Sequence, residues 1–286
     1  MENNIEFIHD HTEDGLLLQA IHFESEKKEV CVLFVHGMAD SIVDNRFVHP
    51  LAKELNNNKI GFFFGHNRGY SHMNDILCSN GKHKRIGSSF EIFEECIYDI
   101  DLWLKKVKEL GYKKIVIVAH SFGCTKTIYY LSEKGMLVDG LVLASPPDVY
   151  ALAAMGVPNY QELLKLAEEN IRNNEKDKII LGDAKVFNLV SSETFVNKYK
   201  KGSKCHNIPV MANPEKFTQL EKIKIPIFAF SGAKEYPIYH QLELLKKKAM
   251  GTSIFEYKII EDTGHTYRDK EKEIAKLILN FIENNI

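Results

Sequence analysis

The sequence predicts an α/β protein with a mostly parallel central sheet flanked by helices. Short apolar runs such as 30–35 and 140–144 alternate with segments whose apolar residues recur at helical spacing. This alternation is typical of strand–helix–strand units, which have parallel strands and right-handed crossovers. Polar residues suited to catalysis follow several of the apolar runs, and sheets of this kind bind ligands outside the carboxyl ends of their strands.

The first half of the chain contains six predicted strands. Runs at 5–9 and 16–23 predict a hairpin, and runs at 30–35, 60–64, 115–118 and 140–144 predict buried strands. Helices are predicted at 47–55, after Ser121, and over about 90–107. The last begins at a capping box, Ser88–Glu91, and ends at Gly111. Glycines and basic residues predict a loop over 76–87.

The pattern changes between residues 149 and 222, where we expect no strong strand. This stretch is too long for an ordinary loop, and its spacing predicts helices over 160–171 and 191–199. We interpret 149–222 as a helical cap inserted after the sixth strand, with 1–148 and 223–286 forming the core. Several large residues of the cap are suited either to line a substrate pocket or to hold the cap on the body. They are Tyr150, Met155, Tyr160, Phe187, Phe195 and Tyr199.

The chain then returns to strand and helix patterns. Strands are predicted at 225–230 and 254–260, and helices at 242–249 and at the C-terminal end. The second strand alternates apolar with charged residues, which is typical of an exposed edge strand.

Composition excludes several classes of protein. The net charge is −2, so no basic field for nucleic acid is present. No apolar run approaches the roughly 20 residues of a membrane span, and the N-terminus lacks a secretory signal. The five cysteines are scattered without a C-x-x-C pair, so we expect no zinc site and no disulfide framework. We therefore expect a cytoplasmic protein without metal or cofactor, either monomer or homodimer.

Ser121 is the candidate nucleophile. It follows the apolar run 115–118 at once, and Gly123 comes two residues later. A turn this tight between a strand and a helix forces the serine into a strained conformation, which exposes its hydroxyl near the helix N-terminus. A serine hydroxyl is a weak nucleophile near neutral pH and needs a neighbouring base.

His265 is the candidate base, because it follows the last predicted strand directly behind Gly264. A neutral imidazole in this role needs an acid that fixes its tautomer. Glu235 follows a strand and precedes His265, and we predict it as that acid. Asp148 also follows a strand and stays the alternative, although it could instead cap a helix that opens the cap.

Two backbone amides are candidates for the oxyanion hole. The N–H of Phe122, directly after the nucleophile, is the first. The second is expected in the loop after His36 and Gly37, most simply from Met38. Gly37 would allow the backbone to approach closely here.

These features together resemble the α/β-hydrolase superfamily over nearly the whole chain, and the segment 67–71 looks like that family's Asp-x-Arg-Gly-x-Gly-x-Ser loop. More narrowly, the chain resembles bacterial capped esterases, similar to cinnamoyl and feruloyl esterases and to uncharacterised relatives. Ala119 stands where the family usually has its first motif glycine, and Glu235 where it usually has aspartate. The matching residues are Ser121, Glu235, His265, His36, Gly37, Asn67, Arg68, Gly69 and Ser71.

The resemblance implies a serine hydrolase that cleaves a small carboxylic ester through an acyl-enzyme. A thioesterase or acyltransferase of a biosynthetic pathway would use the same site, and the basic run 82–85 could then assist a thioester substrate. A non-catalytic binding protein on this fold is a remote alternative. Its expected signature, loss of the serine, the histidine or the oxyanion glycine, is not seen.

Overall fold

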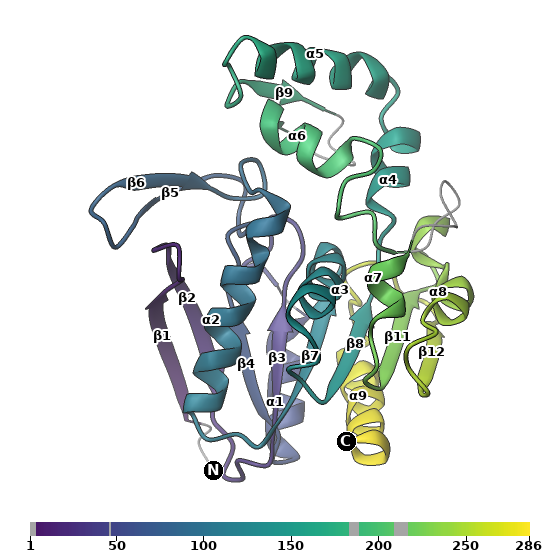
Figure 1. Cartoon of the computed structure of the whole chain (residues 1–286). Helices are drawn as coiled ribbons and strands as arrows, with labels where there is room; N and C mark the ends of the chain where they lie inside the picture. Colours follow the sequence, from purple (N-terminus) through teal and green to yellow (C-terminus); the bar gives the residue numbers. More distant parts are fainter. Residues whose placement is uncertain (1–3, 46, 183–188, 209–216) are drawn as a thin grey trace.

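The computed structural model describes residues 4–45, 47–182, 189–208 and 217–286. Eight strands form one sheet in the order β1-β2-β4-β3-β7-β8-β11-β12 (Figure 1). β1, β2 and β4 pair antiparallel, and all other neighbours pair in parallel. The predicted mostly parallel sheet is therefore confirmed. Its strands are β1 (Ile5–His11), β2 (Leu17–Phe23), β3 (Val30–Val35), β4 (Gly61–Gly65), β7 (Lys114–His120), β8 (Gly140–Ala144), β11 (Ile227–Gly232) and β12 (Phe255–Ile260).

The buried strands separate two hydrophobic cores. Successive side chains of a strand point to opposite faces, so Cys31 and Leu33 of β3 enter one core and Val32 and Phe34 enter the other. Figure 1 shows α2, α3 and α8 over the first face, with α1 and α9 behind the second. These helices are α1 (Val48–Asn57), α2 (Cys96–Glu109), α3 (Phe122–Lys134), α8 (Leu242–Lys248) and α9 (Glu271–Asn285), and a short 3₁₀ helix η2 (Pro237–Tyr239) precedes α8.

The predicted capping box at Ser88–Glu91 is wrong. The helix α2 begins at Cys96, after a short 3₁₀ helix η1 (Phe93–Glu95). The Glu91 carboxylate instead accepts hydrogen bonds from the ammonium groups of Lys126 and Lys198. Bonds between ionised groups are about twice as strong as neutral ones, and both lysines come from distant parts of the chain that no local pattern brings together.

The predicted loop over 76–87 is also wrong, because most of this stretch forms a hairpin. β5 (Asn74–Leu77) pairs antiparallel with β6 (His83–Ile86). The Nε atom of Arg85 lies 3.0 Å from Oδ1 of Asp75 on the opposite strand, and such cross-strand ion pairs favour pairing. Lys84 Nζ lies 3.0 Å from Glu95 Oε2. The basic run therefore belongs to a paired strand.

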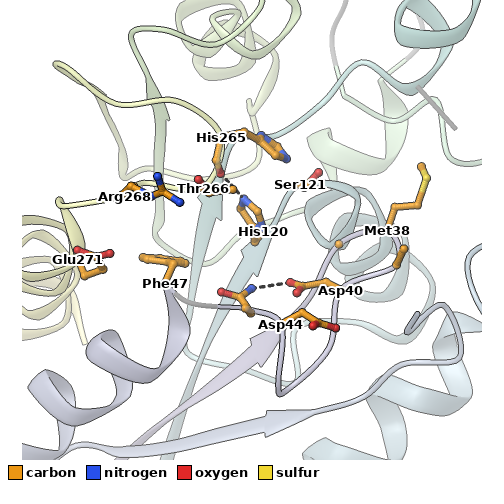
Figure 2. Close-up of a pocket in the computed structure, with 13 residues that line it drawn as sticks. Met38, Asp40, Asp44, Phe47, His120, Ser121, His265, Thr266, Arg268 and Glu271 are labelled. Carbon is orange, nitrogen blue, oxygen red and sulfur yellow. Dashed lines mark hydrogen bonds between the residues drawn. The ribbon is translucent and has the colours of Figure 1, made fainter. Parts of the chain in front are cut away.

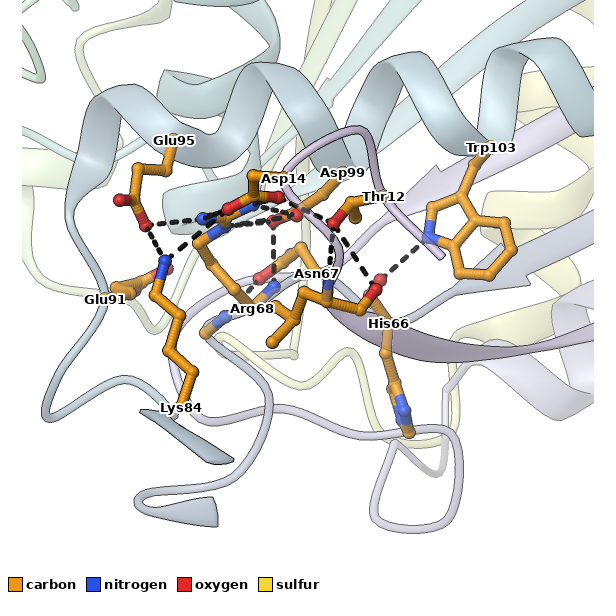
Figure 3. A network of polar contacts seen from close by, with 12 residues as sticks. Thr12, Asp14, His66, Asn67, Arg68, Lys84, Glu91, Glu95, Asp99 and Trp103 are labelled. Carbon is orange, nitrogen blue, oxygen red and sulfur yellow. Dashed lines mark hydrogen bonds and ion pairs between the residues drawn. The ribbon is translucent and has the colours of Figure 1, made fainter. Parts of the chain in front are cut away.

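A network around Arg68 holds the loop after β4 against α2 (Figure 3). The buried guanidinium donates to Asp99 Oδ1 at 2.9 Å and to Asp14 Oδ2 at 3.0 Å, and it also donates to Glu95. Burial alone would raise the pKa of Asp14, but Arg68 outweighs it and lowers that pKa to about 2. The network fixes the loop that carries Asn67 next to α3, the helix that follows Ser121.

The range 149–222 is here called the cap, and its described residues lie mostly above the carboxyl ends of the parallel strands (Figure 1). The predicted helices at 160–171 and 191–199 are confirmed. We expected no strong strand, and the described part of the cap contains only two three-residue strands, which pair antiparallel; strands this short leave no periodic pattern. The elements are α4 (Val149–Gly156), α5 (Tyr160–Arg172), β9 (Ile179–Leu181), β10 (Leu189–Ser191), α6 (Ser192–Tyr199) and α7 (Thr218–Glu221).

Most large cap residues hold the cap together. Tyr160, Phe195 and Tyr199 are buried in a third core that also contains Phe122 of α3, whereas Met155 is 67% exposed. Phe187 lies outside the described residues. Within the described ranges, each helix is too short or too polar to pass through a bilayer.

Candidate active site

Ser121 occupies a strained turn between β7 and α3. Its φ is 54° and its ψ is −127°, a region that costs a residue other than glycine about 1–3 kcal/mol. Two backbone bonds hold it there: its N–H donates to Ala144 O, and its carbonyl accepts from Cys124 N, both at 2.9 Å. Gly123 is required for packing, because a Cβ at this position would lie 2.2 Å from Val35 O.

His265 is bonded to Glu235, as the sequence predicted for the base and its acid. Nδ1 of His265 lies 2.8 Å from Glu235 Oε2, and the Glu235 side chain is 1% exposed. Burial would raise the pKa of Glu235, but hydrogen bonds from His265 and Ser145 outweigh it and lower that pKa. An ionised Glu235 keeps the proton of a neutral His265 on Nδ1, which leaves Nε2 as an acceptor.

Sequence reasoning missed the residues that hold Glu235. Oε1 of Glu235 accepts from Ser145 Oγ and from Gly232 N, each at 2.6 Å. Ser145 is itself strained, with φ 52°, and its hydroxyl bonds to the buried Tyr267 hydroxyl. One feature of the sequence could have pointed to Ser145: it directly follows β8, the strand that lies beside β7, just as Ser121 directly follows β7.

His120 supports the loop that carries His265, a role that the sequence did not suggest. Its Nε2 donates to the His265 carbonyl oxygen at 2.9 Å, and the two rings lie 4.7 Å apart. Burial lowers the pKa of His120 to about 3, so this ring is neutral at ordinary pH and acts as a fixed hydrogen-bond donor.

Asp148 is the N-cap residue of α4. Its Oδ1 accepts from the Ala151 N–H at 2.9 Å at the start of α4. Its Oδ2 has no hydrogen-bond partner in the part of the chain that the structure describes, and burial raises the pKa of Asp148 to about 7. The structure thus joins Glu235 to His265 and assigns the alternative acid a different local contact.

The loop after β3 approaches Ser121 closely. A Cβ on Gly37 would lie 2.9 Å from Ser121 Cβ, so only glycine fits here without displacement. Buried His36 holds the loop: its Nδ1 donates to Gly37 O and its Nε2 accepts from Asn67 N, each at 2.9 Å. Phe122 is the first residue of α3, and the first amides of a helix have no intrahelical acceptor.

Ser121 and His265 line one cavity of about 600 Å³ (Figure 2). Met38, Asp40, Asp44 and Arg268 contribute to the same wall. Charged groups of both signs therefore face the space in which a substrate would lie. Among the residues that the structure describes, no group of three histidine, cysteine or acidic side chains is arranged to hold a metal.

We expect Asp40→Asn to change how stability depends on pH. Burial raises the pKa of Asp40 to about 6, although Asn45 and Ser41 donate hydrogen bonds to it. Between pH 4 and 6 the folded protein then keeps a proton on Asp40 that the unfolded chain has lost, so the contribution of Asp40 to wild-type stability falls as the pH rises. Asparagine cannot ionise, and the variant should gain about 3 kcal/mol relative to wild type between pH 4 and 7. Urea unfolding at both pH values checks this; an equal difference at the two would contradict it.

The fold of this chain is similar to folds of known proteins. A family model described as serine aminopeptidase, S33, matches residues 26–268. The DcsB protein, solved with its substrate analogue, is similar with a TM-score of 0.71 and 12% identity, covering 99% of both chains. Est1E from Butyrivibrio proteoclasticus, solved with ferulic acid, has a TM-score of 0.65 and 12% identity, covering 97% of this chain and 98% of that one.

A thermostable carboxyl esterase from Bacillus coagulans has a TM-score of 0.66 and 15% identity, covering 98% of each chain. At these identities the likeness shows the fold alone. None of the curated proteins matches this sequence.

Proposed function

This chain belongs to the serine aminopeptidase S33 family of α/β hydrolases, and from that premise we propose that it is a serine hydrolase that cleaves carboxylic esters through an acyl-enzyme. The observation that carries the proposal is the 2.8 Å bond between His265 and a buried Glu235 beside the cavity that Ser121 lines. A strained serine, a histidine with a fixed tautomer and a buried carboxylate are the parts of a nucleophilic triad.

In the proposed reaction, Ser121 attacks the substrate carbonyl while His265 Nε2 accepts the hydroxyl proton. The ionised Glu235 stabilises the imidazolium that forms. The negative charge on the carbonyl oxygen is held by the N–H groups of Phe122 and Met38. His265 then protonates the leaving alcohol, and a water molecule activated by His265 releases the acid and restores Ser121.

A thioesterase or acyltransferase is the second candidate, because the same residues would serve it. The basic run that could assist a thioester is less available than its sequence implies: Lys84 pairs with Glu95, and Arg85 pairs with Asp75. The matching family model is described as a serine aminopeptidase, so amides belong in any test. We favour esters, in keeping with the fold shared with a carboxyl esterase.

The proposal is tested by labelling the protein with a fluorophosphonate and locating the adduct by mass spectrometry. We expect a single adduct on Ser121. Turnover of p-nitrophenyl esters, acyl-CoA thioesters and amino-acid p-nitroanilides then ranks the three substrate classes. Labelling at another serine, or none at all, contradicts the proposed nucleophile, whereas labelling without ester turnover contradicts only the ester preference.

A further inference from the structure

Three buried charged side chains join the cap to the body, and we call them the ion cluster. Lys198 lies on α6 of the cap, Lys126 on the helix that follows Ser121, and Glu91 in the segment before α2. The exposed fraction is 0% for both lysines and 2% for Glu91. Oε1 of Glu91 accepts from Lys198 Nζ at 2.7 Å, and Oε2 accepts from Lys126 Nζ at 2.6 Å.

The surrounding residues are built for this cluster. Lys198 also donates to Ser88 O, and Lys126 to Asn67 Oδ1, each at 2.8 Å. A Cβ on Gly69 would lie 2.2 Å from Glu91 Oε2, so this glycine makes room for the carboxylate. Two ammonium groups share one carboxylate here. A buried arrangement of this kind is weak evidence for stability, because removing charges from water costs several kcal/mol per ion.

The ion cluster and the neighbouring Tyr199 contact side chains of the two residues to which we assign the oxyanion hole. The ring of Phe122 lies near both ammonium groups, with its centroid 5.1 Å from Lys126 Nζ and 5.0 Å from Lys198 Nζ. These distances are within the range of cation–π attraction. The next residue of α6 contacts the side chain of Met38, whose N–H is the other proposed donor: the Tyr199 hydroxyl lies 3.8 Å from Met38 Sδ. Neighbouring residues of one cap helix thus reach both sides of the oxyanion hole.

We propose that Lys198 is a positioning residue: through Glu91, Lys126 and the Phe122 ring it seats α6 against both oxyanion donors, so that the hole is complete only when the cap is seated. The inference rests on the proposed serine hydrolase function. It predicts an effect on the transition state, because donors must lie about 2.7–3.1 Å from the developing oxyanion. A cap that served only to admit substrate would affect binding instead.

Lys198→Met tests the inference, because it removes the ammonium group, keeps most of the side-chain length and leaves Glu91 paired with Lys126. End-point fluorophosphonate titration counts the active serines, and kcat is expressed per active serine. We expect kcat for p-nitrophenyl butyrate to fall about tenfold. This is less than the 10²–10³-fold fall in kcat that follows complete loss of an oxyanion donor. KM should stay within about threefold of wild type. The inhibition constant of butylboronic acid, which forms a tetrahedral adduct on the serine, should rise about as much as kcat falls.

Lys200→Met is the matched control. Lys200 follows α6 and is 54% exposed, and its Nζ lies 2.9 Å from Glu168 Oε1 within the cap. We expect wild-type values for this variant. The inference is overturned if Lys198→Met matches Lys200→Met in kcat per titrated serine and in boronate affinity. Absence of labelling in the wild type would instead contradict the serine hydrolase function itself, and the inference with it. If Lys198→Met does not fold, Tyr199→Phe replaces it in the same assays. This variant removes the contact between the Tyr199 hydroxyl and Met38 Sδ, and we expect a smaller fall in kcat than for Lys198→Met.

A double-mutant cycle tests whether the three charges act together. Glu91→Gln leaves two buried ammonium groups without a counter-charge, and we expect its melting temperature to fall by at least about 6 °C. Adding Lys198→Met removes one of these charges, so the double variant should melt above Glu91→Gln alone. A double variant that melts lower than Glu91→Gln would overturn the ion cluster as a unit.

Discussion

Replacing Ser121 by alanine is expected to lower turnover by at least about 10³-fold and to abolish fluorophosphonate labelling. The hydroxyl is the proposed nucleophile, and the residual rate would come from substrate binding and the oxyanion amides alone. Kinetics with p-nitrophenyl esters measures the loss, and mass spectrometry of the labelled protein measures the adduct.

The alanine variant should keep the fold, so that lost activity reports on chemistry. Alanine suffers the same strain as serine at φ 54°, and the two backbone bonds at Ser121 do not involve its side chain. We therefore expect a circular dichroism melting curve close to that of wild type. A variant that still forms the adduct, or that keeps wild-type turnover, would show that another residue is the nucleophile.

Glu235→Gln should lower kcat by about 10⁴-fold, the effect of giving the histidine the wrong tautomer. Ser145 and Gly232 both donate to Oε1 of Glu235, so the amide oxygen of glutamine must take that position. The amide NH₂ then faces His265 Nδ1 and donates to it, which places the imidazole proton on Nε2. A ring protonated at Nε2 cannot accept the Ser121 proton.

Asp148→Asn is the control, and it also decides between the two acids that the sequence left open. Asparagine is as good a helix N-cap as aspartate, so α4 should remain in place. We expect kcat within about threefold of wild type near neutral pH. A large loss in Asp148→Asn together with a small loss in Glu235→Gln would reverse the assignment.

The sequence predicts the sheet because each buried strand has its own local pattern. Strands such as β3 and β7 are continuous apolar runs, and the residues of the site directly follow such runs, so their convergence at one edge follows from parallel topology. The hairpin at 5–23 and the edge strand β12 were predictable for the same reason.

The features that the sequence did not predict depend on contacts between segments that are distant in the chain. Glu91 fits a helix-capping pattern, yet two lysines 35 and 107 positions away take its carboxylate. The β5–β6 pairing depends on charged side chains that also suit a loop. Ser145 and Tyr267 hold the acid through hydroxyls that have no distinctive neighbours in sequence. In each case the decisive partner is set by tertiary structure, which overrides local preference.

The pairing of β8 with β11 constrains how such a protein can change during evolution. The chain leaves the body after β8 and is back in it by α7, whose Leu220 lies in a core of the sheet, and the neighbouring strands β8 and β11 are directly hydrogen-bonded. The strand pairing of the sheet is therefore complete without any cap residue, so a different cap could be inserted here without changing the sheet. The ion cluster limits such an exchange: Glu91 and Lys126 form a balanced pair within the body, whereas Lys198 adds an extra cation. A chain with both lysines but without Glu91 would hold two buried cations and no counter-charge, so we expect a cap that brings Lys198 to need the acidic residue on the body.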